Sequence, residues 1–316
     1  MRTVWQCLIL TSLALTARPA HPADAAAATT PAPSAAPASA PARSMAEILA
    51  ASPASAWRAL NDDHTLYMEL PGGRVIIELL PALAPRTVAN IEALVRLHYF
   101  DGLSILRVQD NYVTQWGDPD GVRKVPDNMQ KLAPEFSVPL GAAAFTLLPD
   151  RDGYAPQVGF VDSFAAARDP ATGMAWLTHC YGAVGVGRDV DPASGNGSEL
   201  YAVIGNAPRH LDHNVTVVGQ VRQGIELLSS LPRGTAAMGF YDKPAQRVTI
   251  ASTQLASDVP AAQRARLEVL RSDSPTFAAV VESRRNRHDD WYLRPAGYIE
   301  LCNVPLPVRA VATSNP

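Results

Sequence analysis

Residues 99–118, YFDGLSILRVQDNYVTQWGD, place one arginine and one glutamine inside two otherwise apolar stretches. Arg107 follows Ile-Leu, and Gln115 follows Tyr-Val-Thr. These stretches indicate two half-buried strands joined by a polar Gln-Asp-Asn turn. A buried guanidinium is costly unless it is paired or used for a function. Arg107 is therefore either the partner of a carboxylate on an edge strand or part of a functional site.

Further landmarks follow a fixed order along the chain. A helix pattern that begins at a proline precedes the hairpin, and three glycine-containing strand patterns follow it. The four stretches are 85–91 (PRTVANI), 182–188 (GAVGVGR), 197–205 (GSELYAVIG) and 215–221 (VTVVGQV), with Leu211-Asp212 between the last two. This order resembles the cyclophilin-type peptidyl-prolyl isomerases, and the resemblance covers residues 65–255.

The strand patterns predict a mainly β fold. Alternation over 65–70 and again over 74–79, around Pro-Gly-Gly, indicates a hairpin, and helices are expected over 85–99 and 224–231. Many strands without a β-α-β order favour a closed antiparallel barrel. The resemblance implies a closed eight-stranded cyclophilin-like barrel that is capped by two helices.

The composition divides the chain into segments. We expect a signal peptide over 1–25, an Ala/Pro-rich disordered linker over 26–42, a helical lead-in over 43–64, the barrel domain over 65–255 with an insertion at about 119–181, and a C-terminal extension over 256–316. The extension is expected to be helical or irregular, with a helix-like pattern over 259–272, and to pack on the barrel.

The N-terminus predicts export. Met-Arg precedes an apolar run, and Ala23-Asp24-Ala25 offers a small-x-small cleavage site. The apolar run is too short to remain as a membrane span, so we expect a periplasmic protein without stable membrane insertion. Cys180 and Cys302 follow the predicted signal. They either form a disulfide that ties the extension to the barrel or remain two separate buried thiols.

The resemblance implies an isomerase that needs neither a nucleophile nor a cofactor. In the twisted X-Pro amide the prolyl nitrogen becomes pyramidal and accepts a hydrogen bond, which a guanidinium can donate. Arg107 corresponds to the catalytic arginine, and Gln115 to the glutamine that orients it. The implied substrate-binding residues are Tyr112, Val113, Gly187, Arg188, Glu199, Tyr201 and Leu211. Glu199 has an alternative role as an ion-pair partner of Arg107 or Arg188.

Several positions depart from the family pattern. Leu106 and Val215 stand where histidines are usual, and His210 stands in place of a tryptophan. Tyrosines at 112 and 201 replace phenylalanines, which keeps the rings and adds hydroxyl groups. Val113 replaces a common methionine. These changes preserve the arginine chemistry but alter the surroundings of the groove.

Other kinds of site are weakly indicated. His210 and His213 lack a second pair of metal ligands, and 189–197 lacks the full spacing of a calcium loop. Ser198 has no Gly-x-Ser-x-Gly frame. The basic run at 284–287 is followed by two aspartates, which indicates a solvated helix end and not a nucleic-acid surface. We therefore expect no metal and no nucleic-acid partner.

Two functions follow from these patterns. The first is a peptidyl-prolyl cis-trans isomerase that assists the folding of exported proteins. The second is a cyclophilin-like module that binds proline-containing polypeptides without useful turnover. Arg107 with Gln115 favours the first, whereas Leu106 and Val215 favour the second.

Overall fold

The computed structural model describes residues 43–288 and 291–311, so the predicted signal peptide and linker lie outside the described residues. The helices are α1 (Met45–Ala50), α2 (Pro85–Arg96), α3 (Ile225–Ser229) and α4 (Pro275–Arg285). The strands are β1 (Trp57–Ala59), β2 (Thr65–Leu70), β3 (Gly73–Leu79), β4 (Ser104–Val108), β5 (Val113–Gly117), β6 (Val138–Pro139), β7 (Thr146–Leu147), β8 (Gln157–Val161), β9 (Phe164–Asp169), β10 (Met174–Leu177), β11 (Ala183–Val186), β12 (Leu200–Val203), β13 (Val217–Gln223), β14 (Val248–Thr249), β15 (Ser252–Leu255), β16 (Leu267–Leu270) and β17 (Val308–Ala310).

The principal sheet is antiparallel and has the order β14-β4-β5-β12-β11-β13-β3-β2-β15. The predicted hairpin is confirmed as β2–β3. The expectation of a closed eight-stranded barrel is wrong, because the sheet has nine strands and its edges β14 and β15 do not pair. Both edges belong to one continuous segment. Between them, the backbone N–H of Ile250 donates to Leu103 and that of Ala251 donates to Glu69, so the main chain passes from one edge to the other.

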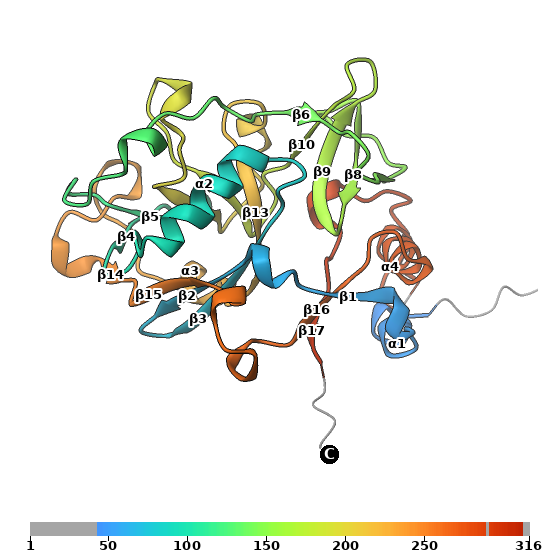
Figure 1. Ribbon diagram of the computed structural model, residues 1–316. Coiled ribbons are helices and arrows are strands. Elements are labelled where there is room, and N and C mark those ends of the chain that lie inside the picture. The colour runs from blue at the N-terminus through green and yellow to red at the C-terminus, as the bar shows by residue number, and fades with distance from the viewer. Residues whose placement is uncertain (1–42, 289–290, 312–316) are drawn as a thin grey trace, which may run out of the picture. The chain divides into compact units, whose positions relative to one another are not determined.

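Two helices, α2 and α3, contribute apolar side chains to the core of this sheet, and Figure 1 shows α2 lying along it. Pro85 occupies the start of α2, where its missing N–H costs nothing. Val88, Ile91 and Leu94 then recur at helical spacing and are fully buried. Leu228 of α3 joins the same cluster. The helix predicted after residue 85 is confirmed, and it fixes one side of the curled sheet.

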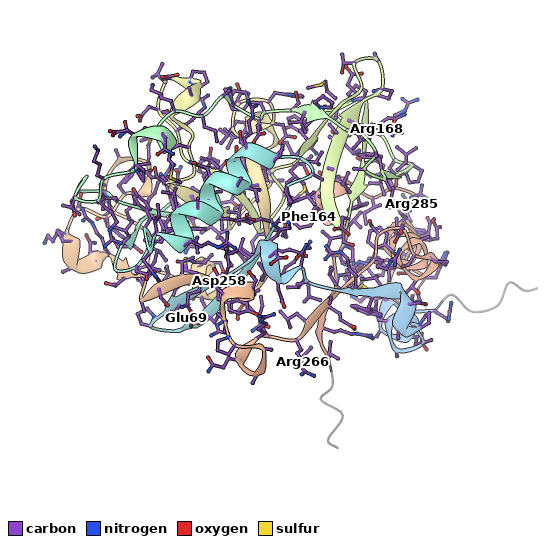
Figure 2. All side chains as sticks on the ribbon, in the orientation of Figure 1. Glu69, Phe164, Arg168, Asp258, Arg266 and Arg285 are labelled. Carbon is purple, nitrogen blue, oxygen red and sulfur yellow. A yellow bond between two sulfur atoms is a disulfide. The ribbon has the colours of Figure 1, made fainter. Side chains whose placement is uncertain are left out.

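The insertion forms a sheet of its own, which the sequence did not predict. Its order is β6-β10-β9-β8-β7. The turn before β9 meets the principal sheet at a buried ion pair, in which Arg222 Nε donates to Glu78 at 2.8 Å and Arg222 Nη1 donates to the Ser163 carbonyl at 3.1 Å. The carbon of the Arg222 guanidinium lies over the Phe164 ring, 4.1 Å from its centroid; Phe164 is labelled in Figure 2. These contacts hold the inserted sheet against the principal one.

The extension differs from its expected form. Residues 259–272 do not form the predicted α-helix, because β16 pairs with β1 and β17 in a three-stranded sheet. The strand β1 interrupts the predicted helical lead-in, where α1 is short. The helix α4 begins only after Ser274, whose hydroxyl accepts from the Phe277 N–H at 3.1 Å, with Pro275 at the first helical position. Pairing with distant strands decided the structure of this segment.

The extension packs on the insertion and on the principal sheet. Phe277 of α4 meets Phe160 of β8 edge-to-face, with ring centroids 4.9 Å apart. Leu267 lies in a cluster with Tyr67 of β2. Cys180 and Cys302 form a disulfide, which joins the end of the insertion to the extension. The two segments added to the barrel are thus linked covalently.

Candidate active site

A groove of about 970 Å³ opens over β4, β5 and β12. It is also lined by the end of β11 and by residues from several loops, among them 187–198, 211–215 and 238–240. The structure brings all nine predicted catalytic and substrate-binding residues into this one groove: Arg107, Tyr112, Val113, Gln115, Gly187, Arg188, Glu199, Tyr201 and Leu211.

Arg107 is held by neutral groups. Its Nη1 donates to Gln115 Oε1 at 3.1 Å, its Nε donates to the Met238 carbonyl at 2.7 Å, and its Nη2 donates to Gln109. Within residues 43–288 and 291–311 it forms no ion pair, so the interpretation of Arg107 as the partner of a carboxylate is wrong. A register shift between Ile105 and Arg107 in the β4–β5 ladder aligns Arg107 with Gln115.

The surroundings of Arg107 are partly apolar. The Tyr112 and Phe240 rings lie 5.6 and 5.4 Å from the guanidinium carbon. Burial lowers the pKa of Arg107 from its ordinary value, but a guanidinium remains charged at physiological pH. Phe240 was not predicted, because it comes from a loop without a regular pattern and reaches the site by a single bridge to Arg107.

Glu199 supports Gln115. Gln115 Nε2 donates to Glu199 Oε2 at 2.8 Å, and Gln115 lies opposite Tyr201 in the β5–β12 ladder. Burial raises the pKa of Glu199, and the charges of Asp189 and Asp118 raise it further, although the hydrogen bond from Gln115 opposes this rise. Glu199 forms no ion pair with either arginine in the described part of the chain. Gln115 thus connects the Glu199 carboxyl group to Arg107 by two hydrogen bonds.

Arg188 is turned to the backbone. Its Nε donates to the Asn214 carbonyl at 2.8 Å and its Nη1 to the Asp189 carbonyl at 2.7 Å. Gly187 leaves little room above Glu199, because a Cβ there would lie 3.0 Å from the Glu199 Cβ. This end of the groove is therefore narrow and polar.

The apolar floor of the groove is formed by Tyr201, with Val113 and Leu211 beside it. Tyr201 is 6% exposed, and its hydroxyl lies 2.8 Å from His179 Nε2. Burial raises the pKa of Tyr201 above its ordinary value, so the hydroxyl keeps its proton. The ring covers Gly185, where a Cβ would lie 2.3 Å from the Tyr201 hydroxyl oxygen. The absence of a side chain at residue 185 thus accommodates the tyrosine.

Comparisons with known proteins agree with this geometry. The family described as cyclophilin type peptidyl-prolyl cis-trans isomerase/CLD matches the chain over residues 65–255. The chain belongs to this family. It is an isomerase whose substrates are proline-containing peptides and proteins. In the described residues of this cyclophilin, no helix has the length and apolar character that a membrane span requires.

Relatives and a solved structure resemble this cyclophilin to different extents. A probable peptidyl-prolyl cis-trans isomerase of Brucella suis biovar 1 is 28% identical over 179 residues, which cover 57% of this chain and 76% of the relative. The isomerase CYP23 of Arabidopsis thaliana is 29% identical over 182 residues, covering 57% and 66%. The crystal structure of cyclophilin AquaCyp293 from Hirschia baltica matches with a TM-score of 0.67 and 24% identity, covering 82% of this chain and 95% of that one. This last similarity concerns the fold.

Proposed function

We propose that this cyclophilin is an exported isomerase in which Arg107 assists rotation about X-Pro bonds. The observation that carries the proposal is the orientation of Arg107 without a carboxylate partner. A guanidinium has five N–H groups, and three of them are donated to Gln115, Met238 and Gln109. Five minus three leaves two N–H groups for a ligand in the groove.

The reaction needs only a stabilised twisted amide. Amide resonance gives rotation a barrier of about 18–20 kcal/mol, and the twisted state places a lone pair on the prolyl nitrogen. A guanidinium N–H aimed at that lone pair binds the transition state better than the planar substrate. Tyr201, Val113 and Leu211 provide an apolar floor for the pyrrolidine ring, and Gly187 and Arg188 lie where substrate backbone groups bind.

The test uses a peptide with one X-Pro bond and measures its exchange rate by NMR in the presence of the full chain. Arg107→Ala removes the donor, Arg107→Lys keeps a charge but lacks the planar fork, and Arg271→Ala removes a surface arginine that pairs with Asp273 outside the groove. We expect Arg107→Ala to lose about 100-fold or more in turnover, Arg107→Lys to lose less, and Arg271→Ala to match the wild type.

Two outcomes contradict the proposal. A folded Arg107→Ala chain that keeps more than about a third of the turnover removes Arg107 from the mechanism. A wild-type chain that binds the peptide but leaves its exchange unchanged is a binding module, which Leu106 and Val215 in place of histidines favour.

Export is supported by the N-terminal pattern and by the Cys180–Cys302 disulfide, because disulfides persist mainly in oxidising compartments. Cell fractionation and N-terminal sequencing of the full chain produced in a Gram-negative host test this part. We expect a periplasmic protein that begins close to residue 26. A cytoplasmic protein that retains Met1 contradicts export but leaves the isomerase mechanism untouched.

A further inference from the structure

A line of buried polar side chains runs from the groove floor into the insertion. The Tyr201 hydroxyl contacts His179 Nε2 at 2.8 Å, and His179 Nδ1 contacts Asp212 Oδ1 at 2.8 Å. Arg209 Nε donates to Asp212 Oδ2 at 2.6 Å, and both terminal nitrogens of Arg209 donate to Asp152 at 3.0 Å. His179 is 0% and Arg209 2% exposed. Such complete burial of charged and polar groups is tolerated because each has a partner.

The protonation of this line follows from its partners. Burial by itself would raise the pKa of Asp212, but the hydrogen bond from His179 and the charge of Arg209 outweigh it, so the pKa lies below its ordinary value. An ionised Asp212 can only accept, which places a proton on His179 Nδ1. With a single proton on the ring, Nε2 is the acceptor and the Tyr201 hydroxyl donates to it.

These contacts fix two sides of the groove at once. Tyr201 forms the floor, and its ring lies nearly parallel to the His179 ring, with centroids 6.2 Å apart and planes 13° apart. Leu211, which lines the wall, stands in the chain between Arg209 and Asp212. A displacement of His179 would therefore reach the surface on which the pyrrolidine ring is proposed to bind.

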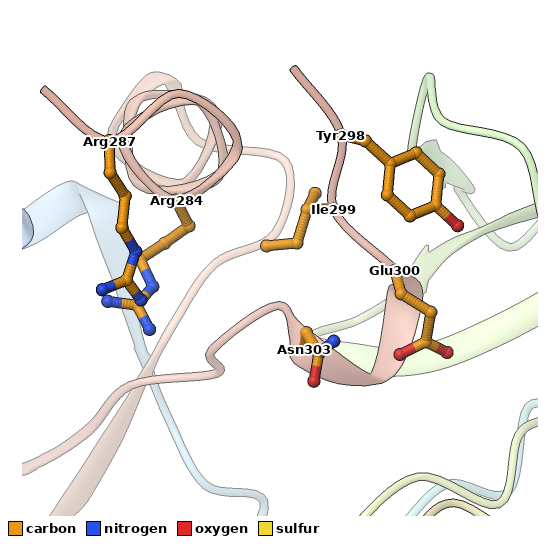
Figure 3. Close-up of a pocket in the computed structure, with 6 residues that line it drawn as sticks. All are labelled: Arg284, Arg287, Tyr298, Ile299, Glu300 and Asn303. Atoms are coloured by element: carbon orange, nitrogen blue, oxygen red, sulfur yellow. The ribbon is translucent and has the colours of Figure 1, made fainter. Parts of the chain in front are cut away.

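The insertion and the extension hold His179 in place. His179 directly precedes Cys180, which is bonded to Cys302 of the extension. At the other end of the line, Asp152 follows closely after Asp150, which accepts from Arg285 of α4 at 2.7 and 2.8 Å and from the Ile299 N–H at 3.1 Å. Ile299 lies on the segment that faces α4 across the hollow in Figure 3.

We propose that His179 is a positioning residue of the isomerase, which holds the Tyr201 ring in place as the floor of the proline pocket. This inference rests on the proposed assignment of the groove. It gives the insertion and the extension a role in substrate binding, because they anchor His179 from both sides. None of these added residues touches the substrate; they act through Tyr201 and Leu211.

Two substitutions at residue 179 separate positioning from stability. His179→Asn places an amide near the position of Nδ1, which keeps the contact with Asp212 but leaves the Tyr201 hydroxyl without an acceptor. His179→Gln places its amide near the position of Nε2, which keeps an acceptor for Tyr201 but removes the side-chain contact with Asp212, whose other hydrogen bonds from the residue 179 N–H and from Arg209 remain. Each variant loses one of the two side-chain contacts of a buried histidine, so the two are matched controls.

The measurements are kcat and KM for the X-Pro peptide, with the melting temperature recorded for each chain. A pocket floor contacts the substrate in the ground state and in the transition state, so its loss raises KM and leaves kcat nearly unchanged. We expect His179→Asn to raise KM about tenfold, the equivalent of one buried hydrogen bond, and His179→Gln to raise it less than about threefold. Equal KM values for the two variants, raised or not, overturn the proposal.

A second measurement uses Tyr201→Phe, which removes the hydroxyl through which His179 acts. In that background His179→Asn should not raise KM further, and a repeated tenfold rise overturns the proposal. If His179→Asn does not fold, Asp212→Asn is measured in its place, in the wild type and in Tyr201→Phe. It should raise KM in the wild type but not in Tyr201→Phe, and an equal rise in both overturns the proposal. Arg107→Ala is measured beside these chains. Unchanged turnover in Arg107→Ala refutes the groove assignment, whereas its loss together with equal KM values refutes only the role of His179.

Discussion

The two sides of the groove are built in different ways. On the arginine side, Arg107 is held by Gln115 and Gln109, which lie on or beside the same hairpin, and by a carbonyl. On the floor side, Tyr201 depends on His179, which is fully buried and anchored by charged partners. On the arginine side, the direct partners of the partly exposed Arg107 are neutral groups, whereas the floor side is a buried ionic network.

Because of this difference, substitutions on the two sides should affect different properties, the isomerase rate on one side and the folding stability on the other. Breaking one partner of a buried charge network leaves an uncompensated charge and is strongly destabilising. Removing a half-exposed donor costs little folding energy but removes transition-state stabilisation. Substitutions on the arginine side should therefore change turnover in a folded protein, and those on the floor side should change stability and substrate binding.

The largest expected effect concerns the disulfide behind the floor. Cys180 and Cys302 are separated by 122 residues, and closing a loop of that size stabilises by about 5 kcal/mol in terms of chain entropy. We expect the double change Cys180→Ser and Cys302→Ser to lower the free energy of unfolding by an amount approaching this value. Denaturant unfolding measures it, and reductant should destabilise the wild type but not the double variant. Identical unfolding of both oxidised chains would show that no bridge forms.

The next effect compares two glycines that lie two residues apart, Gly185 beside the Tyr201 ring of the floor and Gly187 beside Glu199 of the arginine side. At Gly185 an added Cβ would lie 2.3 Å from the Tyr201 hydroxyl oxygen and 2.4 Å from the adjacent ring carbon. At Gly187 its nearest neighbour would be the Glu199 Cβ at 3.0 Å. Gly185→Ala should displace Tyr201, costing about 1–3 kcal/mol of stability and raising KM.

For Gly187→Ala the Glu199 side chain needs to move by only a few tenths of an ångström. We therefore expect the free energy of unfolding to fall by less than about 1 kcal/mol and KM to change little. Peptide titration and thermal unfolding of both variants check this order. A Gly187→Ala chain that is more damaged than Gly185→Ala would show that the floor adapts more readily than the arginine side.

The sequence was informative for the arginine side because its signal is local. An arginine and a glutamine in two consecutive strands, on either side of one short turn, come close together in a hairpin, and the register shift between Ile105 and Arg107 then aligns the two residues. The ordered glycine-containing strands then placed Glu199, Gly187 and Tyr201 in the same groove. All nine proposed site residues line it, and their roles there stay predictions.

The floor network was missed because its signal is spread over distant segments. Asp152 belongs to an Asp-Arg-Asp-Gly stretch that indicates an exposed turn, and only Arg209, 57 residues later, makes it a buried partner. His179 carries no pattern of its own. The strand β16 was taken for part of a helix, because its partners β1 and β17 lie far away in the chain. Burial that depends on such contacts cannot be inferred from local periodicity.

A smaller effect concerns the pH dependence of the arginine side. Because burial raises the pKa of Glu199, the folded chain keeps a proton there that the unfolded chain releases. Between the ordinary and the raised pKa, this group therefore makes stability decrease as pH increases. Turnover should change in the opposite direction, because the carboxylate that forms at higher pH accepts more strongly from Gln115 and orients it toward Arg107.

The comparison chain is Glu199→Gln, which lacks this carboxyl group. All other carboxyl groups are common to both chains, so their contributions cancel in the difference between the two. We expect the difference in unfolding free energy between the two chains to depend on pH in the weakly acidic range, and turnover of the wild type to decline by about two- to fivefold as pH falls through it. Parallel pH profiles of the two chains in both measurements would mean that Glu199 does not titrate there.

The smallest effect is expected from Tyr112→Phe, and it tests the comparison most directly. The Tyr112 hydroxyl has no hydrogen-bond partner among the residues that the structure describes, and the ring itself faces Arg107 at 5.6 Å. Removing the hydroxyl should leave kcat and KM within about twofold of the wild type, because this half-exposed group can hydrogen-bond only to water and its loss leaves no protein group unpaired. Tyr112→Ala, which removes the ring, should raise KM clearly.

The same chemical change on the floor, Tyr201→Phe, leaves His179 Nε2 without a hydrogen-bond partner in a buried site and should cost about 1–3 kcal/mol of stability. Thermal unfolding and peptide titration of the two Tyr→Phe chains give the answer. If Tyr112→Phe is the more damaging of the two, the hydroxyl on the arginine side binds substrate, and the floor is not the side of the groove that depends on a fixed tyrosine.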